Sequence, residues 1–399
     1  MPSSILQKTT NFFQLYRYIC GDSEVPDVYH FWASVALIAA TVEDRVFYQH
    51  YKHEKLYPNL FIMLVGPSGL GKGQAISQVV RLAEHSITIN KYRGRVTSPH
   101  LIDYLGKPTI DEFGQKHLAN PRLWLIMDEL QNDVGNNRRM TEDFIYLLTE
   151  LYTASGYTVN TGTRTHGQVD IENPLLNWLV GTTEGSLRKL LTKDNLSEGF
   201  TARTCFIFGV YDYSKRISRV KYPADYEEIF HHLCCRLWLM QRLCGEMKMT
   251  VSAEAEMDKW YKTRPAPEEE LMAPVWQRQQ AFLFKFAMIL SLADGGPLVI
   301  RRQHIIRAKA MVTKITQFYE VLVEAASETK ETKPENILLD YIKKKGQVEH
   351  TPASRYFRKV HGMNSKAFRD VVNTLAFEGY IVKARTETGA ALYLYKNVD

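Results

Sequence analysis

The sequence predicts an α/β protein with a parallel sheet, flanked by helical segments, and a smaller α+β unit at the C-terminal end. The first observation is the alternation of short apolar runs with helical patterns between residues 56 and 215, typical of a parallel sheet covered by helices. The second is a charged segment, residues 327–335, after which a separate set of helix and strand patterns begins. A length of 399 residues allows two or three domains.

These patterns divide the chain into five expected segments. They are a helical segment at 1–55, an α/β core at 56–215, a second helical segment at 216–326, a linker at 327–335 and a compact unit at 336–399. The linker is expected because SETKETKPE has almost no apolar content and contains a proline. The last unit has three helix patterns followed by two short strand patterns joined by a turn.

Charge and cysteine content narrow the class of protein. The chain carries a net charge of +6, and residues 333–399 hold 12 Lys/Arg against 7 Asp/Glu, so most of the excess lies in the last unit. Five cysteines, an odd number in a long chain, favour a reducing compartment over a disulfide scaffold. The longest apolar run, residues 31–42, is shorter than the roughly 20 residues of a membrane span, and residues 1–14 lack a signal-peptide pattern. We expect a cytoplasmic protein with no membrane partner.

A glycine-rich loop lies between the apolar strand 59–65 and a helix pattern at 74–84, and it has the form G-x-x-x-x-G-K. Its glycines allow backbone N–H groups to surround phosphate oxygens, and the helix N-terminus faces the same anion. Lys72 would reach the β- and γ-phosphates of ATP. The alternative is a strand–helix turn without a ligand. The expected nucleotide-binding residues are Gly66, Pro67, Ser68, Gly69, Leu70, Gly71, Lys72, Gly73 and Gln74.

An acidic pair follows the buried strand pattern LWLIM. Asp128 would hold Mg²⁺, directly or through water, and Glu129 would polarise the attacking water. A solvated acidic pair at a strand end is the alternative. Gly73 stands where serine or threonine would place a hydroxyl on the metal, so a water or another side chain must fill that position. Thr182 and Thr183 end the next strand and could contact the γ-phosphate or the attacking water.

The order of these elements resembles AAA+ ATPases, and more specifically the replication ATPases of phages and mobile elements related to the minichromosome-maintenance helicases. The resemblance covers roughly residues 25–215. It rests on FWASVALIAATVEDRV with LYPNLFIMLVGPSGLGKG, on LWLIMDEL, on TELYTASGYTVNTGTRTHGQVDIENPLLNWLVGTTEGSL and on GFTARTCFIFG. It implies an AAA+ P-loop core with a helical leader and a helical lid.

The resemblance also implies roles for single residues. Lys72, Asp128 and Glu129 keep the roles given above, and Thr182 or Thr183 becomes the first sensor. Arg203 becomes an arginine finger that acts on ATP bound by a neighbouring subunit, which requires a homo-oligomer such as a ring or hexamer. The lid would supply a second cation, with Arg278 as the first candidate and Lys285 as the second.

Two regions are candidates for DNA binding. Residues 156–170 read as a β-hairpin, and the resemblance implies that it grips DNA in a channel through Arg164, His166 and Thr163 or Thr165. A solvent-exposed hairpin without a ligand is the alternative. The C-terminal unit resembles a winged helix, whose third helix would enter the major groove of duplex DNA, although such domains also bind proteins. Its candidate DNA-binding residues are Arg355, Arg358, Lys359, Lys366, Arg369, Lys383 and Arg385.

The leading hypothesis is therefore an ATP-dependent DNA motor, a helicase of a phage or mobile element that uses ATP and Mg²⁺. Its expected partners are DNA, further copies of the chain and replication proteins. The alternative is an ATPase that does not unwind DNA: a helicase loader, an origin-binding initiator or a regulatory ATPase. A DNA-packaging motor would need a nuclease domain with clustered acidic residues, and the C-terminal segment has none.

Overall fold

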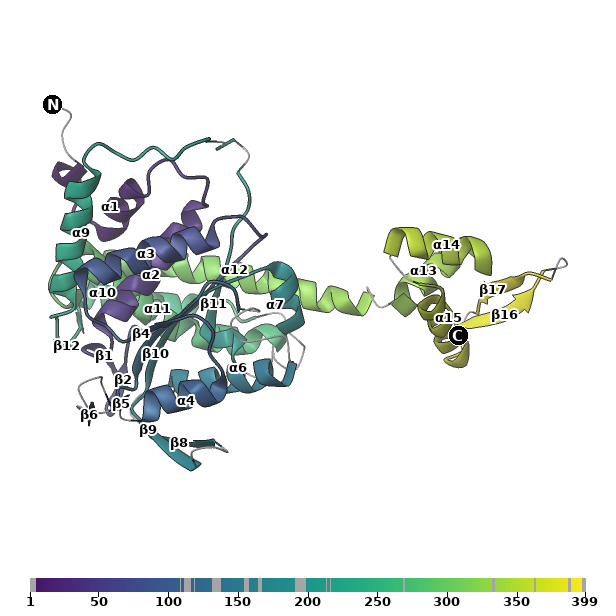
Figure 1. The fold of residues 1–399 in the computed structure, drawn as a ribbon, viewed down its shortest axis with the longest axis horizontal. Coiled ribbons are helices and arrows are strands. Elements are labelled where there is room, and N and C mark those ends of the chain that lie inside the picture. The colour runs from purple at the N-terminus through teal and green to yellow at the C-terminus, as the bar shows by residue number, and fades with distance from the viewer. Residues whose placement is uncertain are drawn as a thin grey trace. The chain divides into compact units, whose positions relative to one another are not determined.

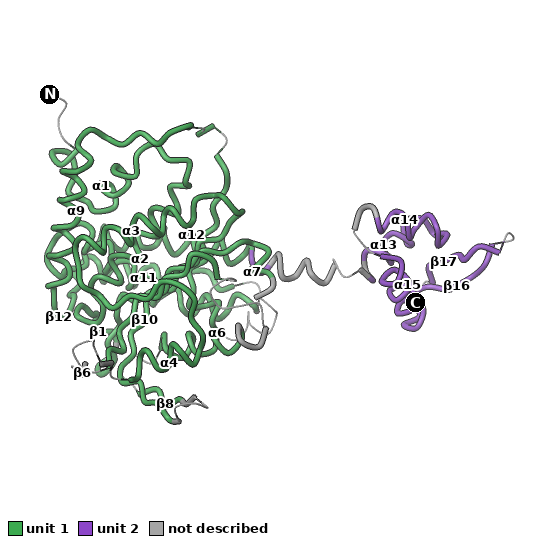
Figure 2. Tube along the Cα trace, in the orientation of Figure 1, with its two compact units in different colours: residues 1–321 green, residues 322–399 purple. Residues whose placement is uncertain are grey.

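The computed structural model describes residues 5–107, 109–110, 116–117, 119–130, 138–153, 158–163, 167–190, 199–212, 214–215, 217–267, 270–331, 334–361, 364–386 and 389–396. The chain divides into two compact units, residues 1–321 and 322–399 (Figure 2). Among the described residues, no helix combines the length and the apolar character needed to cross a membrane.

A five-stranded sheet forms the centre of the first unit (Figure 1). Its strands are β3 (Phe61–Val65), β4 (Lys91–Arg93), β7 (Arg122–Met127), β10 (Leu175–Thr182) and β11 (Thr204–Phe208). All neighbours run parallel, in the order β11-β3-β10-β7-β4. The expected α/β class with a parallel sheet is confirmed.

Strand register determines which residues meet at each edge of this sheet. Thr182 of β10 lies opposite Val65 of β3, and Val180 lies opposite Met127 of β7. The loop after β3, the acidic pair after β7 and the end of β10 therefore share the carboxyl edge, where ligands of such sheets usually bind. At the other edge, Thr204 of β11 lies opposite Phe61 of β3.

Helices cover both faces of the sheet. Helix α2 (Asp27–Val42) packs against β3, β10 and β11, and next to it lies α3 (Lys72–Ser86). Figure 1 shows these two helices on one side of the sheet and α4 (Ser98–Gly106) with α6 (Arg138–Thr153) on the other. Helix α2 is apolar on nearly every side because it is enclosed by the sheet and by other helices.

The helices after the sheet belong to the same unit as the N-terminal helices. Helix α9 (Tyr226–Met240) packs against α1 (Phe12–Ile19) and α3, and α11 (Ala273–Asp294) packs against α2, with the Trp32 and Phe286 rings 5.3 Å apart. The first unit thus joins the expected helical leader, core and second helical segment.

Its remaining helices are η1 (Ile5–Gln7), α7 (Glu184–Leu190), η2 (Thr201–Arg203), α10 (Val251–Thr263), η3 (Glu270–Met272) and α12 (Arg302–Glu331). Its remaining strands are β1 (Val46–Tyr51), β2 (Glu54–Leu56), β5 (Thr109–Ile110), β6 (Lys116–His117), β8 (Thr158–Thr163), β9 (Gly167–Glu172), β12 (Gly245–Glu246), β13 (Lys248–Met249) and β14 (Val299–Ile300).

Asp294, at the C-terminal end of α11, ties several of these helices together. Its carboxylate accepts hydrogen bonds from Asn11 Nδ2 at 2.6 Å, from His304 Nε2 at 3.1 Å and from Arg307 Nη1 at 3.1 Å. Burial alone would raise the pKa of Asp294, but these donors lower it far below its usual value. The carboxylate therefore contributes stability that is present above about pH 4, the unfolded value, and is lost as the pH falls below it.

We expect Asp294→Asn to be less stable than the wild type at neutral pH, by about 1–3 kcal/mol, because charge-assisted hydrogen bonds are lost. The melting temperature of the wild type should fall more steeply than that of the variant between pH 5 and pH 3. Circular dichroism melts across this range measure both effects. Asp258→Asn, an exposed change on α10, is the control. If the melting temperatures of wild type and Asp294→Asn fall in parallel with pH, the Asp294 carboxylate does not cause the loss of stability in acid.

In its described residues the second unit contains the end of α12, three further helices and a three-stranded antiparallel sheet of order β15-β17-β16. Its elements are α13 (Pro334–Lys345), β15 (Gln347–Glu349), α14 (His350–His361), α15 (Ser365–Phe377), β16 (Ile381–Arg385) and β17 (Ala391–Tyr395). Phe357, Phe368 and Ile342 are fully buried in its core. Asn364 Oδ1 caps α15 by accepting from the N–H groups of Lys366 and Ala367 at 3.0 and 2.9 Å.

Three features of this region differ from the sequence expectation. Helix α12 continues to Glu331, through much of the segment expected as a linker. The short strand β15 was not expected. Thr351 followed by Pro352 predicts an N-cap just before a helix, but helix α14 begins at His350, so Thr351 lies inside its first turn. Glu and Lys are good helix formers, which accounts for the longer α12.

Candidate functional site

The loop between β3 and α3 depends on its glycines. Gly69 and Gly71 have φ values of 82° and 84°, in the left-handed region that other residues avoid. A Cβ at Gly71 would lie 2.4 Å from Val25 Cγ2, and one at Gly66 would lie 2.3 Å from the Tyr29 hydroxyl. The loop therefore turns tightly against α2 and the segment before it, and α3 begins directly at Lys72.

The side chain of Lys72 lies inside this loop. Its Nζ donates to the carbonyl oxygens of Gly66 and Pro67 at 2.7 and 2.8 Å, and the residue is 6% exposed. Burial lowers the pKa of Lys72, and the nearby Glu129 carboxylate opposes this shift. The ammonium is thus held by weak neutral acceptors at the position where a phosphate would offer charged ones.

Tyr29 of α2 packs against the first residue of the loop, Gly66. Sequence reasoning missed this residue. Its hydroxyl donates to the carbonyl oxygen of Val65 at 2.6 Å, and its ring fills the space beside Gly66 and Gly209, since a Cβ at Gly209 would lie 2.4 Å from that ring. Burial raises the pKa of the Tyr29 hydroxyl, so it stays protonated as a donor. The only sequence signal was its place at the start of an apolar helix.

The end of β10 lies between Lys72 and the acidic pair. A Cβ at Gly181 would lie 2.5 Å from the carbonyl oxygen of Asp128 and 3.6 Å from Lys72 Cβ. Only glycine allows this approach, so the structure brings Lys72, Asp128 and the tip of β10 together. Sequence reasoning identified the neighbouring threonines but not this glycine.

Gly181→Ala should therefore disrupt the site more than its one added methyl group suggests. The methyl would push β10 away from Asp128, and overpacking of this kind costs about 1–3 kcal/mol. We expect a lower melting temperature and strongly reduced nucleotide binding, measured with a fluorescent ATP analogue. Gly185→Ala is the matched control, because a Cβ there has no neighbour within 4 Å. Equal binding by the two variants would disprove the close approach.

Arg93, the last residue of β4, forms a bidentate ion pair with Asp128. Its Nε and Nη2 lie 3.0 and 2.9 Å from the two carboxylate oxygens, and Nη2 also donates to Ser77 Oγ at 2.9 Å. A metal bound to Asp128 would have to share this carboxylate with Arg93. Sequence reasoning missed Arg93, because only the pairing of β4 with β7 brings it to this edge.

The two threonines at the end of β10 differ in surroundings. Thr182 is fully buried, and its hydroxyl lies 3.5 Å from the carbonyl oxygen of Thr183. The Thr183 hydroxyl donates to Ser186 Oγ at 2.9 Å and accepts from the Ser186 N–H at 3.3 Å, in the first turn of α7. Thr183 thus stabilises a helix start.

A Cβ at Gly73 would meet no atom within 4 Å, which leaves room there for water.

A pocket of about 640 Å³ adjoins the loop. The loop side contributes Gly69, Gly71 and Gln74, and the opposite side contributes Glu24, Tyr211 and Ile217. Glu24 Oε1 accepts from the Ile217 N–H at 2.7 Å, and the Tyr211 hydroxyl donates to the Ser68 carbonyl oxygen at 2.9 Å. The first contact joins Ile217 to Glu24 in the segment before α2, and the second joins Tyr211 to the loop.

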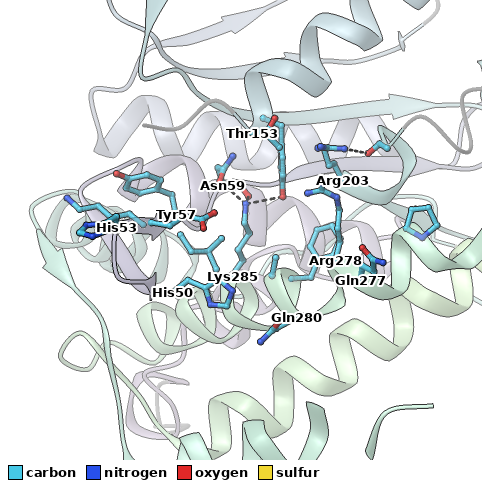
Figure 3. Close-up of a pocket in the computed structure, with 18 residues that line it drawn as sticks. His50, His53, Tyr57, Asn59, Thr153, Arg203, Gln277, Arg278, Gln280 and Lys285 are labelled. Atoms are coloured by element: carbon cyan, nitrogen blue, oxygen red, sulfur yellow. Dashed lines mark hydrogen bonds between the residues drawn. The ribbon is translucent and has the colours of Figure 1, made fainter. Parts of the chain in front are cut away.

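A second pocket, of about 850 Å³, lies at the opposite edge of the sheet. Arg203, Arg278 and Lys285 all line it, as Figure 3 shows. None of the three has a carboxylate partner within the described parts of the chain. The structure therefore brings Arg278 together with Arg203, and not with the loop of the same chain.

Arg203 is held in a turn beside the second pocket. Its Nη1 donates to the carbonyl oxygen of Gly199 at 2.7 Å, while its buried Nε has no hydrogen-bond partner. Burial, together with the positive charge of Arg278, lowers the pKa of Arg203 to about 10. The Tyr319 hydroxyl of α12 lies within hydrogen-bond reach of the backbone carbonyl oxygens of Thr201 and Thr204, and it donates to one of them at a time. Two neighbouring guanidiniums without a counter-ion favour a negatively charged ligand.

The candidate DNA-binding residues are only partly described. Arg164, His166 and Thr165 lie outside the described residues, as does the side chain of Thr163. The strands β8 and β9 form the expected hairpin, with Thr158 opposite Glu172. In the second unit the side chain of Lys359 is not described. The side chains of Arg355, Arg358, Lys366, Arg369, Lys383 and Arg385 are exposed.

Within the described ranges, no group of three or more His, Cys, Asp or Glu side chains is arranged to hold a metal ion. Neither a scan against protein-family models nor a search of curated proteins gave a match. The functional interpretation therefore rests on the glycine-rich loop, the acidic pair and the cationic pocket.

Proposed function

We propose that the protein is an ATP-hydrolysing DNA motor of the AAA+ class, an oligomeric helicase similar to the minichromosome-maintenance group. The observation that carries the proposal is the position of two half-sites on opposite edges of one sheet. The loop with Lys72 and the acidic pair lies at one edge, and Arg203 with Arg278 lies at the other. Such a chain needs a second copy to complete its active site.

Within one subunit, the residues at the carboxyl edge suit the binding of ATP. Backbone N–H groups of the 66–71 loop and the start of α3 would surround the phosphates, while Lys72 would exchange two carbonyl partners for phosphate oxygens. Glu129, close enough to influence the Lys72 pKa, would orient and deprotonate the attacking water. The 640 Å³ pocket beside the loop would take the base and ribose.

Mg²⁺ fits this site through one protein ligand. Asp128 offers a carboxylate at the strand end, and the open space at Gly73 would hold water where the stricter motif has a hydroxyl. The ion would neutralise phosphate charge as the γ-phosphate is transferred. Arg93 would hold the Asp128 carboxylate oriented and would yield part of it to the metal.

The geometry favours action between subunits. Strand β3 has five residues, and at about 3.3 Å per residue it separates Arg203 from the loop of its own chain by roughly 15 Å. An arginine finger must contact the γ-phosphate directly. Arg203 and Arg278 would therefore receive the γ-phosphate held by a neighbouring copy, in a ring or hexamer whose interfaces all join unlike faces.

DNA would be bound by two separate parts of the chain. The β8–β9 hairpin would contact a single strand in the channel of the ring. The second unit has the element order of a winged helix, with α15 as the recognition helix and β16–β17 as the wing. The exposed cations of α14, α15 and β16 would bind the phosphates of duplex DNA or contact replication proteins.

One observation favours a second candidate, an ATPase that does not unwind DNA, such as a helicase loader, an initiator or a regulatory ATPase. Residues 158–172 of the hairpin contain one arginine and no lysine against Asp170 and Glu172, so they carry no net positive charge. A motor that grips phosphates is expected to carry positive charge there.

A strand-displacement assay on a forked DNA duplex separates the two candidates, with Lys72→Ala as the inactive control. ATP-dependent unwinding by the wild type supports the helicase. DNA-stimulated hydrolysis without unwinding overturns the helicase and supports the second candidate. If there is neither hydrolysis nor nucleotide binding, both proposals are wrong.

A further inference from the structure

Lys285 of α11 is a buried lysine whose hydrogen-bond partners within the described part of the chain are all neutral. It is 3% exposed, and its Nζ donates to Asn59 O at 2.8 Å, to Asn59 Oδ1 at 2.7 Å and to the Tyr152 hydroxyl at 2.9 Å (Figure 3). The Nζ also lies 4.3 Å from the centre of the Tyr152 ring. Burial and the charges of Arg278 and Arg203 lower the pKa of Lys285, while Cys205 opposes this.

Tyr152 connects this lysine to the hairpin. It is the penultimate residue of α6, which ends at Thr153, and the hairpin strand β8 begins at Thr158. Its ring packs edge-on against Phe61 of β3 with centroids 4.8 Å apart, so the end of α6 rests on the sheet beside the cationic pocket. The hairpin strands and α6 both pack against α4.

We propose that the Lys285–Tyr152 hydrogen bond is a coupling link between the cationic pocket and the hairpin, and that an anion entering the pocket changes it. The inference rests on the proposed function, because the anion is the γ-phosphate of ATP on a neighbouring copy. Tyr152 is a positioning residue, since it lines the pocket without a charge to offer the anion.

The physical basis is competition for one ammonium group. Without an anion, Lys285 divides its three donors among neutral oxygens, and Arg203 and Arg278 repel it. A phosphate in the pocket would attract all three cations, because an anionic acceptor adds Coulomb attraction that the neutral oxygens lack. The donor given to Tyr152 is the easiest to lose, because Asn59 holds the ammonium through two oxygens. The end of α6 would then have one set of contacts with the nucleotide present and another without it.

The test uses full-length Tyr152→Phe, which removes the hydroxyl and keeps the ring against Phe61. Basal ATP hydrolysis should stay within about twofold of wild type, because no catalytic group changes. We expect the stimulation by single-stranded DNA to fall at least about fivefold, with half-saturation by DNA unchanged. A merely structural defect would lower basal rate, stimulation and DNA affinity together. Tyr146→Phe, an exposed change on the same helix, is the matched control and should leave stimulation intact.

A second variant keeps the test decisive if Tyr152→Phe folds poorly. Lys285→Met removes the donors and keeps most of the side-chain volume. Its ratio of stimulated to basal hydrolysis should fall by the same factor, and the double variant should show no further loss, as expected for two partners in one contact. Multiplying losses, or unchanged stimulation in the single variants, overturn the link while the proposed function stands. A wild type that DNA does not stimulate overturns both.

Discussion

Lys72→Ala is expected to reduce ATP hydrolysis by at least about 100-fold, because it removes the cation that compensates charge on the β- and γ-phosphates. Nucleotide binding should weaken as well, since Lys72 already lies inside the loop and needs little rearrangement to bind phosphate. The variant should fold normally, because its lost partners are two loop carbonyls that water can reach once the side chain is shortened.

The measurement is a steady-state ATPase assay combined with fluorescent-nucleotide binding. Lys107→Ala is the control, since Lys107 follows the last residue of α4 and pairs with Asp103. Hydrolysis within a few-fold of wild type in Lys72→Ala would exclude the loop as the catalytic phosphate site.

Arg203→Ala should bind ATP normally and lose hydrolysis by about 1,000-fold, the lower end of what an arginine finger contributes. Among the described residues, the guanidinium of Arg203 forms a hydrogen bond with Gly199 alone, so the loss of stability should be small. The decisive experiment mixes this variant with Lys72→Ala. One variant supplies an intact loop and the other an intact finger.

In a 1:1 random mixture of the two inactive variants, about a quarter of the interfaces would carry both intact parts. Hydrolysis should therefore reappear on mixing, at roughly a quarter of the wild-type rate. No recovery would place Arg203 and Lys72 in the same active site or exclude the finger altogether. Arg242→Ala, an exposed change in the turn after α9, serves as the control for loss of an arginine.

The parts of the site that depend on local sequence could be predicted. The glycine-rich loop is contiguous, and the strand that ends at Asp128 is contiguous too, so their chemistry can be read without a fold. Arg93 and Gly181 could not be predicted, because they reach the site only through the neighbours of β4 and β10 in the sheet. Strand order is a long-range property that a single sequence does not reveal.

The same limit applies to the cationic pocket. Arg203 and Arg278 are 75 positions apart, and nothing in their local patterns indicates that both line one cavity. Lys285 on a long helix would ordinarily be read as a solvated charge, yet it is buried because Asn59 and Tyr152 supply its acceptors. Strand β15 was missed because three residues give no measurable periodicity.

If hydrolysis takes place between subunits as proposed, the position of Lys72 and Arg203 at opposite edges of the sheet has a consequence for how activity depends on protein concentration. Hydrolysis that needs two copies depends on encounters, so the rate per molecule should fall on dilution below the dissociation constant of the interface. At low protein concentration, single chains would bind ATP without hydrolysing it. Hydrolysis would begin once the concentration approaches the dissociation constant of the interface. The rate of ATP hydrolysis per molecule would then rise with the amount of the protein in the cell.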